Sequence, residues 1–405
     1  MLRAEYGSNV ERGENMRRVR QKEICMAAIT CAAAIVVYIM LLFRPRVSES
    51  MALLSSAITC FLLSWLVGAV ARSREEGKIV TQSQTAQSSV VVFPTRSELP
   101  LTNRSLPWIT NAFSIDLEDY FHTEVASEAV ELRAWESMPS RVHISVPRLL
   151  DLLDEHNTKA TVFVLGWVAH RYPSLVREVA KRGHEIACHS YLHRAVFRLD
   201  RKTFYGDTLK AKHVIEDATG ARVVGYRAPC FSITPGIEWA FDVLTELEFQ
   251  YDSSVNPVRH VFYGNSSAPR HPYYVAKNRL LEIPVATWRI MGMNFPIGGG
   301  AYLRLLPYSY SLAGLNHLNG KEHKPGTVYM HPWEMDHGQP ELELPWLSNI
   351  RQTWGTKTME HKVSNLLGRF AFAPMAEVYS EALLHDRPPL PFRARTAGVH
   401  AEVVT

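Results

Sequence analysis

The stretch Glu185-Ile186-Ala187-Cys188-His189-Ser190-Tyr191-Leu192-His193 places two histidines directly after a short predicted strand, residues 185–187. The spacing of four residues between His189 and His193 puts both imidazoles on one side of a helical turn, so both can reach one cation. Two imidazoles and one carboxylate are the ligand set of a catalytic zinc site that keeps one position open for water. The pattern therefore predicts metal-assisted hydrolysis.

Carboxylates for such a site occur upstream, in the stretch Ser114-Ile115-Asp116-Leu117-Glu118-Asp119-Tyr120. The preceding residues, 112–115, predict a short strand that delivers this acidic cluster at its C-terminal end. One carboxylate would bind the metal, and a spare carboxylate beside it would serve as a base. The acidic cluster therefore supplies the two functions that the histidines lack.

Strands and amphipathic helices alternate through the rest of this region, which predicts an α/β fold with parallel strands and crossover helices. The predicted helices are Val146–His156, Pro173–Arg182, a helix that Asp200 caps and that runs to Thr219 before Gly220, and Pro235–Leu247 capped by Thr234. The further strands are Ala160–Leu165, Val223–Tyr226, Leu281–Val285 and Thr327–Met330. In such folds chemistry gathers at the C-terminal ends of the strands. Asp116, His189, Arg227 and His331 each follow a strand, which favours one shared site.

With these motifs in order, the chain resembles the NodB-type polysaccharide deacetylases, which belong to carbohydrate esterase family 4. The resemblance covers roughly Asn111 to His331, and the region up to Tyr379 resembles the extension of a subgroup associated with exopolysaccharide and exosortase genes. It implies an irregular (β/α) barrel and a zinc-dependent reaction, although Co²⁺, Ni²⁺ and Fe²⁺ bind similar ligands. The implied reaction removes an N-acetyl group, with water on the metal as the nucleophile.

The resemblance also implies a role for each motif residue. Asp116 resembles the catalytic base, Asp119 the metal carboxylate, His189 and His193 the metal histidines, Arg227 the residue that orients the base, Asp252 the support of the catalytic histidine, and His331 the general acid. The family's two acidic residues are adjacent, whereas Asp116 and Asp119 are separated here, with Glu118 between them. Asp116 and Glu118 would share a face of an extended strand, so Glu118 is the alternative metal ligand. Asp119 is preferred because the strand should end before it.

The N-terminal region reads as a membrane anchor. Residues 1–23 form a basic cytoplasmic segment, and 24–71 hold two uncharged spans, Ile24–Phe43 and Met51–Ala71, each long enough to cross a bilayer. Basic residues before the first span predict that both termini face the cytoplasm, in a multi-pass protein of the inner membrane. Two alternatives are a start at Met51, which leaves one span, and a single anchor at the first run with the enzyme outside.

The remaining boundaries follow from composition. Residues 72–107 are a polar linker, 108–380 the catalytic domain, and 381–405 a loose tail. The net charge of +4 is too small to argue for nucleic acid as a partner, and the five cysteines suggest neither a disulfide framework nor a cysteine zinc site.

These observations predict a membrane-anchored, metal-dependent deacetylase acting on an N-acetylated oligo- or polysaccharide. Exopolysaccharide or a lipid-linked precursor is the expected substrate, and proteins of polysaccharide assembly are further expected partners. One alternative is a hydrolase of another C–N bond, such as a formamide or a cyclic amide, on the same fold. The other is a catalytically silent sugar-binding component of polysaccharide assembly.

Overall fold

Strand β1, Asn111–Leu117, lies next to an edge strand of a mostly parallel sheet and is buried along its whole length. The computed structural model describes residues 109–260, 263–277 and 279–384. The polar side chains of β1 find partners inside the protein: Asn111 bonds Asn319, and the Ser114 hydroxyl donates to the carbonyl of Val328 over 2.9 Å. Because these polar side chains are hydrogen-bonded inside the protein, a strand that contains both polar and apolar residues can be fully buried.

The main sheet has nine strands in the order β10-β1-β2-β3-β4-β5-β7-β6, and β11 pairs with the start of β1. All pairings are parallel except that of β6 with β7, while β8 and β9 form a separate antiparallel hairpin. The strands are β2 Thr161–Val164, β3 Glu185–Cys188, β4 Gly225–Tyr226, β5 Tyr251–Asp252, β6 Tyr273–Val275, β7 Leu280–Glu282, β8 Thr287–Ile290, β9 Met293–Pro296, β10 Thr327–Met330 and β11 Phe372–Ala373. The predicted α/β class with parallel strands is confirmed.

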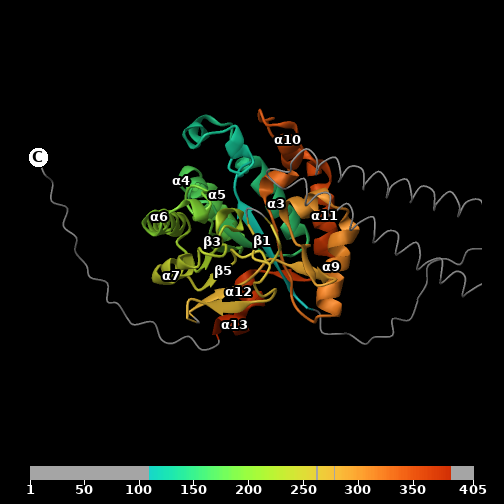
Figure 1. The fold of residues 1–405 in the computed structure, drawn as a ribbon. Coiled ribbons are helices and arrows are strands. Elements are labelled where there is room, and N and C mark those ends of the chain that lie inside the picture. Colours follow the sequence, from blue (N-terminus) through green and yellow to red (C-terminus); the bar gives the residue numbers. More distant parts are fainter. Residues whose placement is uncertain (1–108, 261–262, 278, 385–405) are drawn as a thin grey trace, which may run out of the picture. The chain divides into compact units, whose positions relative to one another are not determined.

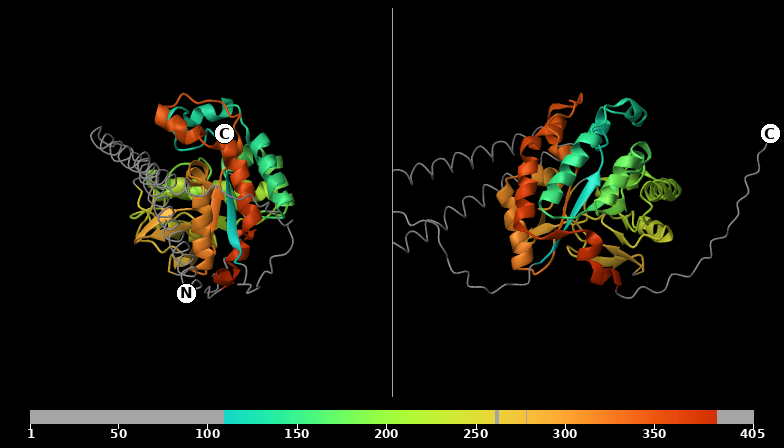
Figure 2. Two further views of the ribbon diagram at one scale, coloured as in Figure 1. Left: turned by 90° about the vertical axis from the view of Figure 1, so that its right-hand side faces the viewer. Right: turned by 180° about the vertical axis from the view of Figure 1, so that it is seen from behind.

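Helices cover both faces of the sheet (Figures 1 and 2). On one side lie α4 Gly166–Arg171, α5 Pro173–Lys181, α6 Arg201–Thr219 and α7 Trp239–Glu246. On the other lie α3 Val142–Glu155, α9 Tyr308–Gly320 and α11 Thr356–Arg369. The shorter elements are α8 Gly300–Leu305, α10 Trp346–Thr353, α12 Met375–Val378, α13 Ser380–Leu384 and the 3-10 turns η1 Ala126–Glu128, η2 Leu132–Ser137, η3 Val196–Arg198, η4 Pro229–Phe231 and η5 Pro332–Met335.

The predicted barrel is only partly formed. In the described residues the two ends of the nine-stranded sheet are not joined by strand pairing. Instead, the chain that leaves β7 at Glu282 reaches the edge of β10, where the Ala286 amide donates to the carbonyl of Thr327 over 2.9 Å. The sheet is therefore a half-barrel whose opening is bridged by irregular chain.

Most predicted elements are confirmed, and the largest differences are at the starts of helices α3 and α7. Helix α6 begins after Asp200, whose side chain accepts from the amide of Thr203, and ends at Gly220 with φ 71°. Helix α3 begins at Val142, four positions before the predicted Val146, and therefore contains Pro147 in its interior. Helix α7 begins at Trp239 rather than Pro235, because residues after Thr234 form a turn instead.

The predicted membrane hairpin at 24–71 and the predicted tail at 385–405 lie outside the described residues. Across 109–260, 263–277 and 279–384, every helix falls short of the length and apolar character that a membrane span requires.

Three successive glycines bring the segment before α8 against β10. Gly299 forms a parallel bridge with Tyr329, and the Tyr329 amide donates to the carbonyl of Gly298 over 2.6 Å. A Cβ at Gly299 would lie 2.1 Å from Cδ1 of Tyr329 and 2.4 Å from its carbonyl oxygen. The backbone approach that starts α8 therefore depends on the absence of a side chain.

We expect Gly299→Ala to lower the free energy of unfolding by about 1–3 kcal/mol or more, because the added methyl group collides with the backbone of β10. Gly206→Ala is the matched control: it lies inside α6, a Cβ there meets nothing within 4 Å, and helix propensity should raise stability by about 1 kcal/mol. Urea unfolding of the two variants measures both effects, and equal stabilities would contradict the close approach.

Candidate active site

Four strand ends gather the predicted polar residues at one end of the sheet. Asp116 is the penultimate residue of β1, while His189, Arg227 and His331 directly follow β3, β4 and β10. The strands are in register, with Ile115 opposite Met330 and Cys188 opposite Tyr226. The predicted placement of these four residues at strand ends is confirmed.

The two histidines meet in a loop rather than on a helical turn, so this part of the prediction was wrong. Ser190 and His193 have φ values of 61° and 51°, which reverses the chain without a helix. The His193 amide donates to the Ser190 hydroxyl over 3.1 Å, and the Tyr191 amide donates to Asp207 over 2.8 Å. Such positive φ values in residues other than glycine cluster at functional sites, where surrounding contacts hold them.

Glu118 supplies the carboxylate beside the two imidazoles. Ligand atoms of Glu118, His189 and His193 lie within 4.8 Å of one another, and all three residues are buried. Glu118 Oε2 lies 2.8 Å from Nε2 of His193, and the two imidazole rings are 5.1 Å apart. One carboxylate and two imidazoles at this separation match the ligand set that the sequence predicts, and Nδ1 of His193 is buried without a hydrogen-bond partner.

The tautomer of His189 also suits a metal ligand. Its Nδ1 lies 2.8 Å from the carbonyl oxygen of Arg227, an acceptor, so Nδ1 carries the proton and Nε2 presents a lone pair. Metal-binding histidines commonly donate their second ring nitrogen in this way. Burial lowers the pKa of His189 to about 4, which keeps the imidazole neutral. The side chains present therefore fit a divalent cation.

Asp119, the preferred metal carboxylate, faces the other way, and its assignment is corrected to Glu118. One oxygen of Asp119 accepts from the hydroxyl of Ser140 (2.7 Å) and the amide of Arg141 (2.8 Å), just before α3 begins. The other accepts from the amide of Tyr120 over 3.0 Å. Glu118 and Asp119 follow the end of β1, where the Glu118 amide donates to the carbonyl of Asp116 over 3.0 Å and the chain turns, so the two side chains reach different partners.

Trp333 holds Glu118 in place, a contact that no motif indicated. Its indole nitrogen donates to Glu118 Oε1 over 3.1 Å, while its ring stacks on His331 with centroids 5.4 Å apart. Burial alone would raise the pKa of Glu118, but the imidazoles of His193, His331 and His189 lower it below its ordinary value. Glu118 is therefore held as a carboxylate.

Asp116 forms a buried ion pair with Arg227. Arg227 Nη1 donates to Asp116 Oδ1 over 2.7 Å, and the two side chains are 0% and 3% exposed. Arg227 also donates to the carbonyl and hydroxyl of Ser253, and its guanidinium lies 4.1 Å from the ring centre of Phe163. These contacts fix the second oxygen of Asp116, Oδ2, at 3.8 Å from Nε2 of His331.

His331 lies between three carboxylates. Its Nε2 is 3.6 Å from Glu118 Oε1, in addition to the contact with Asp116, and its Nδ1 is 3.1 Å from Glu334 Oε2. Burial lowers the pKa of His331, but the charges of Glu118, Glu334 and Asp116 outweigh it and raise the pKa to about 9. His331 therefore carries a proton at neutral pH in this arrangement.

Asp252 does not support His331, which corrects a second expectation. Its Oδ1 accepts from the hydroxyl of Ser254, which in turn accepts from the amide of Ala228 over 2.7 Å. Glu282 is its register partner on β7 and accepts from the amide of Val255 over 3.0 Å. Asp252 thus positions the backbone that follows Arg227, because β5 ends on that side of the sheet.

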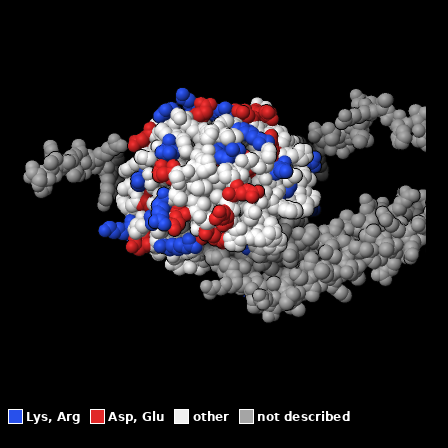
Figure 3. All heavy atoms as spheres, turned by 90° about the horizontal axis from the view of Figure 1, so that it is seen from above, with Lys and Arg blue, Asp and Glu red and all other residues white. Residues whose placement is uncertain are grey.

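Two segments cover the end of the sheet that holds the site. The chain that follows β1, with η1 and η2, lies beside α10 at the top of Figure 1. The side-chain amide of Gln352 donates from Nε2 to the carbonyl of Tyr120 over 2.8 Å, and the Ser348 hydroxyl donates to Glu128 over 2.9 Å. On the face seen from above, basic and acidic side chains are interspersed and neither sign forms a continuous field (Figure 3).

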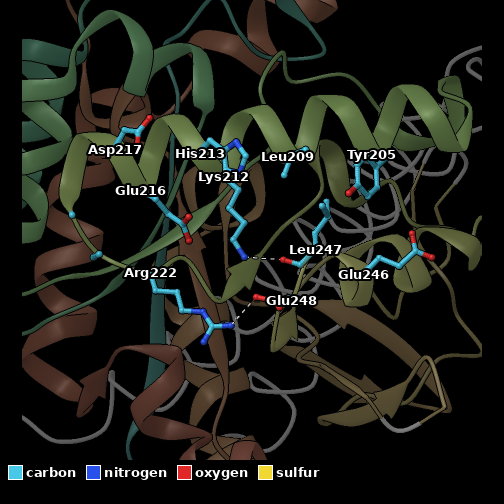
Figure 4. A pocket seen from close by; sticks show the side chains of 12 residues that line it. Tyr205, Leu209, Lys212, His213, Glu216, Asp217, Arg222, Glu246, Leu247 and Glu248 are labelled. Atoms are coloured by element: carbon cyan, nitrogen blue, oxygen red, sulfur yellow. Dashed lines mark hydrogen bonds and ion pairs between the residues drawn. The ribbon is translucent and has the colours of Figure 1, made fainter. Parts of the chain in front are cut away.

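A separate pocket lies between α6 and residues 246–248 and shares no residue with this site (Figure 4). Its arginine and lysine side chains both have partners: Arg222 contacts Glu248 over 3.2 Å, and Lys212 donates to the carbonyl of Leu247 over 2.7 Å. Nothing in its lining resembles the site at the strand ends.

Comparison with known proteins agrees with this geometry. Residues 135–248, which include His189, His193 and Arg227, match the family model "Polysaccharide deacetylase". The chain contains a domain of the polysaccharide deacetylase family. Residues 253–380 match a second model, "Domain of unknown function (DUF3473)", and Asp116 and Glu118 precede both matches. The candidate site at the strand ends thus draws its residues from three successive parts of the chain.

Curated relatives of the deacetylase domain carry related names. A peptidoglycan-N-acetylglucosamine deacetylase of Bacillus cereus is 34% identical over 22% of this chain and 30% of its own length. A chitooligosaccharide deacetylase of Sinorhizobium fredii is 37% identical over 25% of this chain and 45% of its own length. A solved structure from Mycobacterium smegmatis, provisionally named polysaccharide deacetylase, is 22% identical with a TM-score of 0.48, over 72% of this chain and 96% of that one. The chain spans less than half the length of these two curated relatives.

The Asp252–Glu282 pair of the deacetylase domain generates a pH prediction. Burial raises the pKa of Asp252 from 3.8 to about 6, and burial together with the Asp252 carboxylate raises that of Glu282. At a pH above the ordinary pKa values of these carboxyl groups, the folded state therefore binds more protons than the unfolded chain. The free energy of unfolding then falls as pH rises. Glutamine is neutral at every pH, so Glu282→Gln removes the proton uptake of this side chain. We therefore expect the free energy of unfolding of Glu282→Gln, relative to that of the wild type, to rise by about 1 kcal/mol per pH unit between about pH 5 and pH 7.

Urea unfolding of wild type and variant across this pH range measures the effect. Glu343→Gln, at an exposed glutamate, is the matched control and should show a constant difference from the wild type. A constant difference for Glu282→Gln as well would show that the buried pair does not hold an extra proton.

Proposed function

We propose that this chain is a metal-dependent hydrolase that removes N-acetyl groups from an N-acetylated sugar. The observation that carries the proposal is the ligand group of Glu118, His189 and His193. Next to this group lie a carboxylate paired with arginine, Asp116, and a protonated imidazole, His331. A base and an acid beside a Lewis-acid site are the parts that amide hydrolysis requires.

A divalent cation held by Glu118, His189 and His193 would polarise the acetamide carbonyl and lower the pKa of water. The chain's own groups handle the protons. Asp116 Oδ2 takes a proton from water, and the Arg227 guanidinium, which donates to Oδ1, orients the Asp116 carboxylate. His331 Nε2 donates a proton to the nitrogen of the leaving amine, which cannot depart as an anion at neutral pH. The products are acetate and a free amino sugar.

The substrate we propose is an exopolysaccharide or its lipid-linked precursor, and zinc is the metal that the ligand set favours. Two curated relatives are named for N-acetylated glycans, peptidoglycan and chitooligosaccharide, which supports the sugar class. The mixed charge on the covering face suits a substrate without high charge density (Figure 3). Because we propose an exopolysaccharide substrate, we also propose proteins of polysaccharide assembly as partners.

We expect Glu118→Gln to lose its metal and its acetate release from a chitooligosaccharide, whereas Asp119→Asn keeps both. Asp119→Asn should lower stability by about 1 kcal/mol, because the asparagine still accepts hydrogen bonds before α3. Metal content by mass spectrometry of the purified proteins and urea unfolding measure the two effects separately. Loss of metal in Asp119→Asn with full occupancy in Glu118→Gln would reverse the assignment.

The same assay decides between the proposed function and its alternatives. His189→Ala should lose both metal and acetate release, and wild type should release acetate rather than formate when both amides are offered. Asp116→Asn should keep its metal but lose activity. If Asp116→Asn retained the biological function of the wild type, the chain would act as a silent sugar-binding protein.

We also propose that residues 24–71 anchor the chain in the inner membrane as a hairpin, with the catalytic domain on the cytoplasmic side. Basic residues concentrated before Ile24 support this orientation. A reporter enzyme that is active only outside the cytoplasm, fused after Thr405, should be inactive. An active reporter would place the domain on the outer side.

A further inference from the structure

We propose that Glu334, held by Arg304, positions His331 as the proton donor, so that the region matched to a domain of unknown function completes the active site. Arg304, His331 and Glu334 all lie within residues 253–380. This inference rests on the proposed deacetylase function. It assigns to Glu334 the part that the family resemblance gave to Asp252.

Glu334 contacts His331 through one oxygen. Oε2 of Glu334 lies 3.1 Å from Nδ1 of His331 and also accepts from the His331 backbone amide over 3.1 Å. Both contacts arise because η5 begins directly after His331 and turns Glu334 back onto it. The Glu334 side chain is 0% exposed. A buried carboxylate that grips both the ring and the backbone of one histidine leaves the imidazole little freedom.

Arg304 holds the second oxygen of Glu334. Its Nε donates to Oε1 over 3.0 Å, and the two side chains are 1% and 0% exposed. The remaining guanidinium nitrogens of Arg304 donate to the carbonyls of Trp354 and Arg351, beyond and within α10. The guanidinium also lies 5.4 Å from the ring centre of Trp333. Each of the three guanidinium nitrogens of this buried cation thus has a partner, which offsets the cost of its burial.

The chemical consequence lies in which imidazole nitrogen carries the transferable proton. A carboxylate accepts only, so Nδ1 of His331 keeps its proton toward Glu334. The proton available for transfer is then on Nε2, the nitrogen that faces Asp116 and Glu118. When the C–N bond breaks, the amine nitrogen takes the Nε2 proton, and a neutral imidazole remains with Nδ1–H on Glu334. Glu334 touches no reacting atom and is a positioning residue.

Asp252 cannot perform this task. Its carboxylate lies against Ser254 and Glu282, between β5 and β7, where it orients the amide of Ala228. Both buried carboxylates therefore serve the site, but they act on different loops.

The test compares two leaving groups in Glu334→Gln. Hydrolysis of a chitooligosaccharide amide needs a proton on the departing nitrogen, whereas 4-nitrophenyl acetate releases a phenolate that needs none. We expect kcat on the amide to fall by about 10²-fold or more with KM unchanged, since general acid catalysis contributes about 10²–10⁴-fold. Hydrolysis of 4-nitrophenyl acetate should change little. Metal content and thermal unfolding check that the variant remains loaded and folded.

Two further variants sharpen the result. Asp336→Asn removes a carboxylate that pairs with Arg141 at the end of the same turn, and it should affect both substrates alike. In a His331→Ala background, Glu334→Gln should cost nothing further, because its effect passes through His331. Equal losses on both substrates, or additive losses in the double variant, would overturn the proposal.

A measurement on the wild type covers the case in which Glu334→Gln does not fold. Imidazole ¹⁵N NMR, with His331 assigned by its loss in His331→Ala, should show a protonated, hydrogen-bonded Nδ1 at neutral pH. An unprotonated Nδ1 overturns the positioning role whatever the substrate. Absence of acetate release from every amino sugar would instead refute the proposed function, and the NMR result would still decide the orientation.

Discussion

Arg227 is the residue on which the geometry of the site depends. Its side chain forms the buried ion pair with Asp116, and its backbone carbonyl accepts from Nδ1 of His189. One residue therefore orients the base and sets the tautomer of a metal ligand. Breaking a buried ion pair by removing one partner costs about 3–5 kcal/mol, so loss of either charge lowers the stability of the fold. The serine hydroxyls that follow β5 extend this control to the loop after Arg227.

The sequence predicted the residues of the site better than their individual tasks. The ends of the strands can be recognised in the sequence because each is a short apolar run followed by Asp, His or Arg. The parallel register of the strands then brings Asp116, His189 and His331 together. The choice between Glu118 and Asp119 depends on where the chain turns after Leu117. That turn is set by contacts with α3, far along the sequence, which no local pattern encodes.

Two other differences have similar causes. The His189–His193 spacing is the same in a helix and in a loop with positive φ at Ser190 and His193, and only tertiary contacts with α4 and Asp207 favour the loop. Arg304 carries no motif at all, since a lone arginine in a short helix resembles any surface cation. Its burial against Glu334 arises from the glycine run that brings α8 to β10. A contact made by three distant segments leaves no local signal in the sequence.

The adjacency of β1 and β10 has a consequence for how the protein is made. The first and last site strands are neighbours, and the hydrogen bond from Ser114 to Val328 spans 214 positions. During translation, which proceeds from the N-terminus, β1 emerges long before the strand that must cover its open edge. Folding through such distant pairings is slow because loop closure precedes the stabilising contacts. A nascent or truncated chain that stops before Met330 would hold Asp116 and Glu118 beside an uncovered strand edge, a species vulnerable to aggregation and proteolysis.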